Sequence, residues 1–260
     1  MAAVPTASDQ VLAVWWRQFL VWRRLMRPSL ATNVLEPILI LFAFGLGLGG
    51  AIPTMGGLDY IAFVLPGIAC YSVMFAASFE TTIGAFTRFQ TQKTWDAILS
   101  SPVRLIELVT GETVWAVFKG LISAVCVLTV GALWGGVNWL PGAFLAIPTL
   151  LLGAFTFGAC GLLATAMARD YMFFSYFFTF WVTPMFVFSG VFFDIRRFPL
   201  PVEAVSWLFP MTHLIAVVRP LTAGQSLALL PTLGHLAYVA VLGVVAFRFA
   251  YRRLARRLFD

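Results

Sequence analysis

The sequence predicts an all-α integral membrane protein, built as a single transmembrane domain over residues 1–260 with six transmembrane helices. Hydrophobic residues make up 61% of the chain and charged residues 11%, whereas ordinary globular domains carry about 25% charged residues. The apolar residues gather in runs of about 20, the length that an α-helix needs to cross a bilayer. The net charge of +6 comes from basic residues at the ends of those runs, which is typical of membrane proteins and argues against nucleic-acid binding.

The first predicted element is an amphipathic helix at about residues 9–27. Its large apolar side chains recur every three or four residues, at Leu12, Trp15, Phe19, Trp22 and Met26. Its polar side chains cluster on the opposite face, at Gln10, Arg17 and Arg24. This pattern is typical of a helix that lies in the headgroup plane of a membrane. We therefore expect an N-terminal interface helix that ends at Pro28.

Six apolar runs predict the membrane spans. They cover about residues 34–52, 60–79, 113–134, 143–167, 171–190 and 227–247. Residues 120–168 form one uncharged stretch that is too long for a single crossing. Residues 138–142, with a proline and a glycine, divide it between the third and fourth runs.

Residues 191–224, before the last span, mix charged residues and prolines with large apolar residues. Irregular backbone at membrane depth is tolerated only where protein covers it. The composition therefore predicts short re-entrant helices, and a simple surface loop is the alternative.

The distribution of lysine and arginine predicts the orientation. Most of these residues fall on the side that holds both termini, whereas Arg196, Arg197 and Arg219 fall on the other side. Because cytoplasmic loops are enriched in lysine and arginine, we expect both termini in the cytoplasm and a multi-pass chain in the bacterial inner (plasma) membrane.

On the expected cytoplasmic side, the polar segment 80–112 separates the second and third spans. Residues 88–99 predict a short amphipathic helix in this segment. Its two faces carry Phe89, Trp95 and Leu99 on one side and Arg88, Gln92 and Asp96 on the other. We expect this cytoplasmic helix to dock on a partner.

Charged residues at the span ends have several possible partners. Glu36, Glu80 and Glu112 could pair with arginines of the N-terminal helix, or they could be solvated at the interface. Lys119, which lies inside the third span, is expected to extend to the cytoplasmic interface rather than to bind substrate.

The sequence contains no motif of an enzyme or of a self-powered pump. It lacks the GxxxxGK[ST] phosphate-binding loop, an HExxH zinc motif and the GxSxG elbow of a serine hydrolase. Its two histidines, His213 and His235, have no third metal ligand at a suitable spacing, so no metal site is predicted. Transport against a gradient would therefore need another subunit.

Several runs of residues carry a family resemblance. They are Phe79-Glu80-Thr81-Thr82-x-Gly84-Ala85-Phe86-Thr87-Arg88, Lys93-Thr94-Trp95-Asp96-Ala97-Ile98-Leu99 with Ser101-Pro102-Val103, Gly111-Glu112, Thr183-Pro184-Met185 with Phe188-Ser189-Gly190-Val191-Phe192-Phe193, and Leu208-x-Pro210-Met211-Thr212-His213 with Arg219-Pro220. Through these runs the chain resembles, over nearly its whole length, the type-2 ATP-binding-cassette (ABC) export permeases, and most closely their nodulation-factor (lipo-oligosaccharide) branch.

The resemblance implies a transport subunit rather than an enzyme. This chain would hold no cofactor, while ATP and Mg²⁺ would bind to a separate ABC ATPase subunit. Two copies of the permease and two of the ATPase would form the exporter. The coupling helix would contact the ATPase through Arg88, Phe89, Gln92, Lys93, Trp95 and Asp96.

The implied cargo is an amphiphile, foremost a lipo-oligosaccharide or lipid-linked saccharide, moving outward through the membrane lipid between the two copies. Aromatic side chains could line its path: Phe173, Phe174, Phe177, Phe178 and Trp181. Packing against lipid is the alternative for these residues. Other readings of the whole chain are a drug or antibiotic efflux permease of the same superfamily, a membrane-embedded lipid-modifying enzyme, and a pore or secondary carrier.

Overall fold

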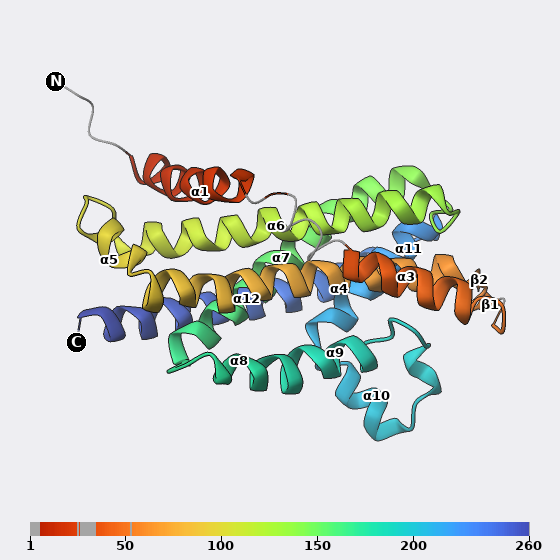
Figure 1. Cartoon of the computed structure of the whole chain (residues 1–260). Helices are drawn as coiled ribbons and strands as arrows, with labels where there is room; N and C mark the ends of the chain where they lie inside the picture. The colour runs from red at the N-terminus through yellow and green to blue at the C-terminus, as the bar shows by residue number, and fades with distance from the viewer. Residues whose placement is uncertain (1–5, 25, 27–34, 53, 260) are drawn as a thin grey trace.

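The computed structural model describes residues 6–24, 26, 35–52 and 54–259 of the chain. Nearly all the described elements are helices, which confirms the all-α class (Figure 1). One short antiparallel hairpin, which the sequence did not predict, joins β1 (Thr54–Met55) to β2 (Leu58–Asp59).

Four helices in the described residues are long and apolar enough to cross a membrane. The first is a continuous helix over residues 60–91, made of α4 (Tyr60–Phe79) and two π-helical segments, η2 (Glu80–Gly84) and η3 (Thr87–Thr91). The other three are α6 (Leu105–Leu133), α7 (Leu140–Met167) and α12 (Leu229–Phe259). These helices contain most of the second, third, fourth and sixth predicted spans, and each extends beyond its apolar run at one end.

The first and fifth predicted spans lie in shorter helices. α3 (Glu36–Gly47) has 12 residues, which gives a length of about 18 Å where the hydrocarbon core is about 30 Å thick. Residue 34, at the start of that predicted span, lies outside the described residues. The fifth segment comprises α8 (Met172–Phe177), the π-helical η4 (Phe178–Val182) and α9 (Thr183–Phe188).

Before the last helix the chain forms η5 (Ile195–Arg197), α10 (Leu200–Ser206) and α11 (Pro210–Ala223). α10 and α11 meet at a bend of 84°, which fits a broken span or a re-entrant loop. Counting this pair as one crossing gives up to five candidate spans in the described part of the chain, so the six-span topology stays a prediction.

The long helices lie side by side, and the two ends of the bundle differ (Figure 1). One end, here called the α5 end, holds α1 (Ala7–Arg24), the short α5 (Thr94–Leu99) and the end of α12. The other, the α11 end, holds the hairpin and α11. α4 is the central helix, because 89% of the residues in its apolar stretch are buried. In α12 the buried share of the apolar stretch is 17%, so this helix lies at the periphery.

The helix expected over residues 88–99 is wrong as a single element. The long helix ends at Thr91, and the backbone N–H of the next residue, Gln92, donates to the carbonyl oxygen of Thr87. Lys93 then adopts a left-handed conformation with φ 53°. Because the chain changes direction at Lys93, the rings of Phe89 and Trp95 meet with centroids 5.0 Å apart. Both rings are buried. Burial of two large apolar rings against one core outweighs the local preference for a continuous helix.

α1 lies along α6 at the α5 end and begins with a capping box. The Thr6 hydroxyl and backbone N–H both donate to the Asp9 carboxylate, and these hydrogen bonds lower the pKa of Asp9. Trp15 packs edge-on against Phe118 of α6 with centroids 5.3 Å apart. α1 also leaves large apolar side chains exposed, at Leu12, Trp16, Leu20 and Val21. An exposed apolar strip of this kind suits a helix at a membrane surface.

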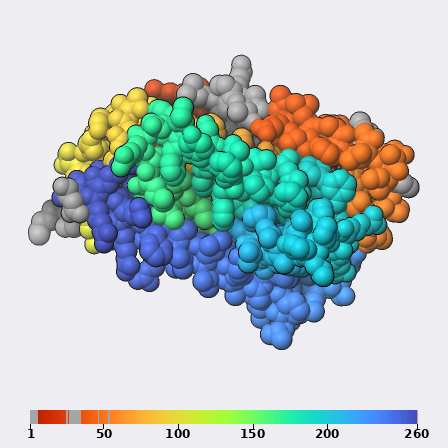
Figure 2. All heavy atoms as spheres, turned by 90° about the horizontal axis from the view of Figure 1, so that it is seen from below, coloured from red at the N-terminus to blue at the C-terminus, as the bar shows by residue number. Residues whose placement is uncertain are grey.

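The C-terminal part of α12 packs back onto the bundle. The Arg257 guanidinium donates to the carbonyl oxygens of Thr165 and Ala168 at the end of α7, at 3.2 and 2.6 Å. It also lies 5.0 Å from the centre of the Phe89 ring. Figure 2 shows this end of α12 (dark blue) next to the yellow α5 region. A cation at the carboxyl end of a helix satisfies its last carbonyl groups.

Candidate functional site

Four charged side chains meet inside the α5 end and form what we call the ion cluster: Glu80, Arg88, Glu112 and Lys119. The Arg88 guanidinium lies between the two carboxylates, with Nη1 2.8 Å from Glu80 Oε1 and Nη2 2.5 Å from Glu112 Oε2. Lys119 Nζ lies 3.8 Å from Glu80 Oε2. Two carboxylates and two cations leave the ion cluster without net charge, which buried ionic groups require.

Glu112 connects the ion cluster to three other elements. Its carboxylate is fully buried and accepts hydrogen bonds from Gln18 Nε2 of α1 at 2.8 Å and from Trp95 Nε1 of α5 at 3.1 Å. It also accepts from Arg88 of η3. Because Glu112 itself belongs to α6, one side chain joins α1, η3, α5 and α6.

The backbone leaves space for these contacts at two glycines. A β-carbon on Gly84 would lie 2.9 Å from an oxygen of Glu80 and 3.2 Å from Arg88 Nη1, so the ion pair crosses over this position. A β-carbon on Gly111 would lie 2.7 Å from the β-carbon of Val14, so α1 approaches α6 closely there. Real β-carbons essentially never come within 3.0 Å of other atoms, so a side chain at either position would force its neighbours to shift.

The structure corrects two hypotheses about these charges. Glu80 and Glu112 pair with Arg88 and Lys119 and receive Gln18 from α1, rather than pairing with arginines of that helix or being solvated at the interface. Lys119 does not extend to the interface: it is 8% exposed and points toward Glu80. Burial favours mutual pairing of these groups because an unpaired charge inside the bundle is costly.

The six predicted docking residues divide into two sets. Those that point into the bundle are Arg88, Phe89 and Trp95. Those that are exposed at the corner and along α5 are Gln92, Lys93 and Asp96. Lys93 and Asp96 lie 4.0 Å apart, and their side chains are 62% and 52% exposed. A pocket of about 500 Å³ separates this surface from α1. The exposed set can contact a partner, and the inward set holds α5 in place.

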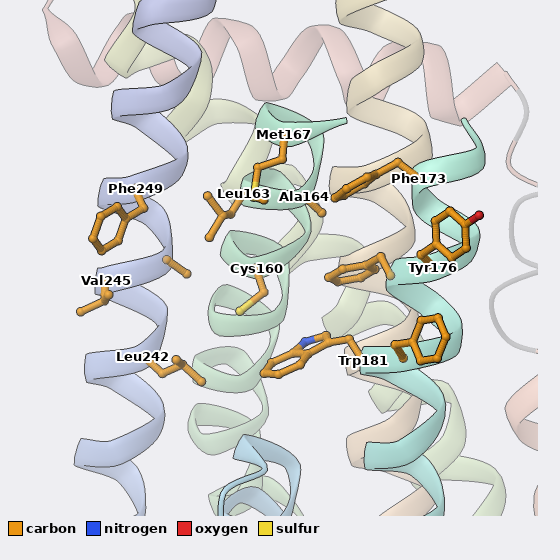
Figure 3. Close-up of a pocket in the computed structure, with 13 residues that line it drawn as sticks. Cys160, Leu163, Ala164, Met167, Phe173, Tyr176, Trp181, Leu242, Val245 and Phe249 are labelled. Carbon is orange, nitrogen blue, oxygen red and sulfur yellow. The ribbon is translucent and has the colours of Figure 1, made fainter. Parts of the chain in front are cut away.

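The five predicted path residues also divide. Phe173, Phe177 and Trp181 line an apolar pocket of about 530 Å³ between α7, the α8–η4 segment and α12 (Figure 3). Phe174 is instead buried against Phe86, with ring centroids 5.2 Å apart. Phe178 packs against the aromatic rings of α4. The pocket can accommodate an apolar chain, because none of the residues that line it in the described part of the structure carries a charge.

Arg219, counted above with the outer loops, lies inside the bundle. Its Nε donates to the carbonyl oxygen of Phe63 at 2.9 Å and its Nη2 to that of Gly190 at 2.6 Å. Its guanidinium also stacks on the Phe63 ring at 3.7 Å. The residue therefore ties α11 to α4 and does not act as a loop charge.

These features define a class of protein: a multi-pass helical membrane protein whose exposed short helix is fixed to a buried ionic junction and whose sequence contains no nucleotide-binding loop. The family model for the ABC-2 type transporter matches residues 9–221, so the chain belongs to the ABC-2 transporter family and is a permease-type transport subunit. It is 32% identical over 260 residues to nodulation protein J of Sinorhizobium fredii, covering 99% of this chain and 97% of that protein.

Two further relatives extend the similarity. Nodulation protein J of Bradyrhizobium diazoefficiens is 31% identical over 259 residues, with 99% of this chain and 97% of that protein covered. The inner membrane transport permease YadH of Escherichia coli is 26% identical over 207 residues, which is 80% of each chain. The resemblance identified from the motifs is therefore confirmed.

Sequence reasoning found Arg88 and Trp95 but assigned them to a surface, and it missed the junction that Glu112 makes with Gln18. The sequence nevertheless contained a signal for the ion cluster. Two acids and two bases occur near the ends of the second and third apolar runs, and helices at that depth must pair such charges. That balance could have predicted an internal ion cluster, although not its individual pairs.

Proposed function

We propose that this chain is the membrane-spanning permease subunit of an ATP-driven ABC exporter, and that it moves an amphiphile from the cytoplasmic side outward. The family implies an ABC ATPase partner. In the proposed assembly, two copies of this chain pair with two copies of a separate ATPase, which binds ATP and Mg²⁺. The cargo we propose is a lipo-oligosaccharide or lipid-linked saccharide, on the basis of the similarity to nodulation protein J over nearly the full length.

The observation that carries this proposal is the link between α5 and the centre of the bundle. The exposed side chains of α5 lie on a helix whose Trp95 is hydrogen-bonded to Glu112. Glu112 is ion-paired through Arg88 to Glu80, at the end of the central helix. A displacement of α5 by a partner is therefore expected to move α4 and α6 together instead of deforming a surface loop.

The orientation follows from the same assignment. We propose six crossings, with the α5 end and both termini in the cytoplasm and the chain in the bacterial inner membrane. The exposed apolar strip of α1 supports a position at the cytoplasmic membrane surface. We further propose that the pocket lined by Phe173, Phe177 and Trp181 receives the apolar part of the cargo.

Purification tests the coupling. The full-length chain, solubilised in mild detergent, should bring down a soluble subunit with a GxxxxGK[ST] loop. The double substitution Lys93→Ala with Asp96→Ala should abolish the stimulation of its ATP hydrolysis by the permease. Arg196→Ala with Arg197→Ala removes two exposed charges from η5 instead of from the α5 region and is the matched control. Full stimulation in the α5 variant would exclude docking at α5.

Two further experiments test orientation and cargo. A cysteine introduced as Lys93→Cys, with the three native cysteines replaced, should react with a membrane-impermeant maleimide in inside-out vesicles and not in right-side-out vesicles. In proteoliposomes the complex should translocate a labelled lipo-oligosaccharide when ATP is supplied. Translocation of a cationic drug in its place would identify the efflux alternative.

A further inference from the structure

The two histidines of the sequence lie against each other at the α11 end. His213 belongs to α11 and His235 to α12, and 22 residues separate them in the chain. Their Nδ1 atoms are 2.8 Å apart, and both side chains are half-buried. At that distance one nitrogen donates and the other accepts, so the two rings share one proton between them.

Neighbouring groups fix both rings in this orientation. His213 Nε2 lies 2.8 Å from the Trp207 carbonyl oxygen, which can only accept, so Nε2 carries a hydrogen and Nδ1 presents its lone pair to His235. A histidine that donates its second N–H to a carbonyl is the usual arrangement of a metal ligand. The Tyr238 ring stacks on His213 at 4.2 Å, and the Trp207 ring stacks on His235 at 5.8 Å.

We propose that His213 Nδ1 and His235 Nδ1 together bind a transition-metal ion that bridges α11 and α12. Two nitrogens about 2.05 Å from a metal lie about 2.9 Å apart when they are adjacent in a square plane, and about 3.3 Å apart in a tetrahedron. The observed separation of 2.8 Å is close to the square-planar value, which Cu²⁺ prefers, and Zn²⁺ requires the two nitrogens to separate by about 0.5 Å. With either ion, each ring turns so that its Nδ1 lone pair points at the metal instead of at the other ring.

Metal binding at the two histidines requires a change of tautomer and further ligands. His235 frees its Nδ1 by moving its proton to Nε2, which is a change of tautomer without net loss of a proton. No third histidine, cysteine, aspartate or glutamate joins the pair among the residues with described positions, so water completes the coordination. Mg²⁺ and Ca²⁺ are not expected to bind, because they take oxygen ligands.

The bridge would strengthen the link between two elements that differ in their other attachments. α11 is one arm of the bent pair and is tied to the central helix through Arg219, whereas α12 is peripheral. A bound ion would fix one to the other. This inference concerns the fold of the chain and does not depend on the proposed transport function.

Electron paramagnetic resonance tests the ligands. One equivalent of Cu²⁺ is added to the detergent-solubilised full chain, which carries a non-histidine affinity tag and whose thiols are blocked with N-ethylmaleimide. The spectrum should show superhyperfine coupling to two imidazole nitrogens. His235→Gln should leave one nitrogen and weaken Cu²⁺ binding by more than the roughly 10- to 100-fold that loss of a second-shell partner costs. Tyr238→Phe, which keeps the ring, should retain the signal.

A wild-type spectrum with fewer than two coupled nitrogens would overturn the proposal, whatever the variants do. An unchanged spectrum in His235→Gln would overturn it as well. The bridge itself is tested by hydrogen exchange with Zn²⁺: the amides of α11 should exchange more slowly in the wild type and not in His213→Gln. Equal exchange with and without Zn²⁺ in the wild type would exclude a bridge.

Discussion

Neutralising Glu112 gives the sharpest test of the ion cluster. Glu112→Gln keeps the shape of the side chain but changes the cluster from net neutral to a net charge of +1, since Arg88 and Lys119 then face Glu80 alone. Removing one partner of a buried ion pair costs about 3–5 kcal/mol. Because the Glu112 side chain is fully buried, we expect a loss of that size in the free energy of unfolding.

Equilibrium unfolding of the detergent-solubilised chain with increasing SDS measures this loss. Asp96→Asn is the matched control, because it removes a carboxylate of the same segment whose partner lies 4.0 Å away in an exposed pair. Exposed pairs are worth about 0–1 kcal/mol, so the control should unfold nearly as the wild type does.

A second substitution tests whether charge balance is the cause. Arg88→Met combined with Glu112→Gln leaves Glu80 with Lys119, so the cluster is neutral again. We expect the double variant to be more stable than the sum of the two single losses predicts, by about 0.5–3 kcal/mol. If Glu112→Gln alone stays within about 1 kcal/mol of the wild type, the cluster does not hold the α5 end together and the reasoning is refuted.

Three further predictions rest on close contacts. Gly84→Ala places a β-carbon 2.9 Å from the Glu80 carboxylate and should lower the free energy of unfolding by about 1–3 kcal/mol, while Gly234→Ala, with open space within 4 Å, should not lower it. Gly111→Ala should lift α1 from α6, which limited proteolysis would detect as faster cleavage of α1; an unchanged cleavage rate would contradict the contact. Arg257→Gln removes the charged donor to the carbonyl groups at the end of α7 and should lower the free energy of unfolding by about 1.5–3 kcal/mol in the same assay. An unchanged unfolding midpoint would show that water caps the end of α7 equally well.

The arrangement along the chain was largely predictable, because it depends on local composition. Apolar runs of bilayer length located the four long helices. The break predicted at residues 138–142 falls at residues 134–139, because Pro141 and Gly142 belong to the first turn of α7. Polar residues such as Glu80 and Glu112 suggested that the apolar helices stop earlier than they do. They continue as helix because their charges are paired across elements, and the spacing in one sequence does not contain that information.

The corner at α5 and the ion cluster could not be predicted for a related reason. Lys93 takes a left-handed conformation that few residues other than glycine adopt, and only the joint burial of Phe89 and Trp95 explains it. Gln18 and Glu112 are 94 residues apart, so their hydrogen bond depends on where α1 lies on α6. Tertiary contacts decide both features.

The contact between Arg257 and α7 also has a consequence for biosynthesis. The carbonyl groups at the end of α7 receive their charged donor from a residue about 90 positions later in the chain. Until the ribosome has completed α12, these carbonyl groups lack the Arg257 guanidinium, so a nascent or prematurely terminated polypeptide cannot make this contact. The last segment to be synthesised thus supplies the charged donor for a helix that lies much earlier in the chain.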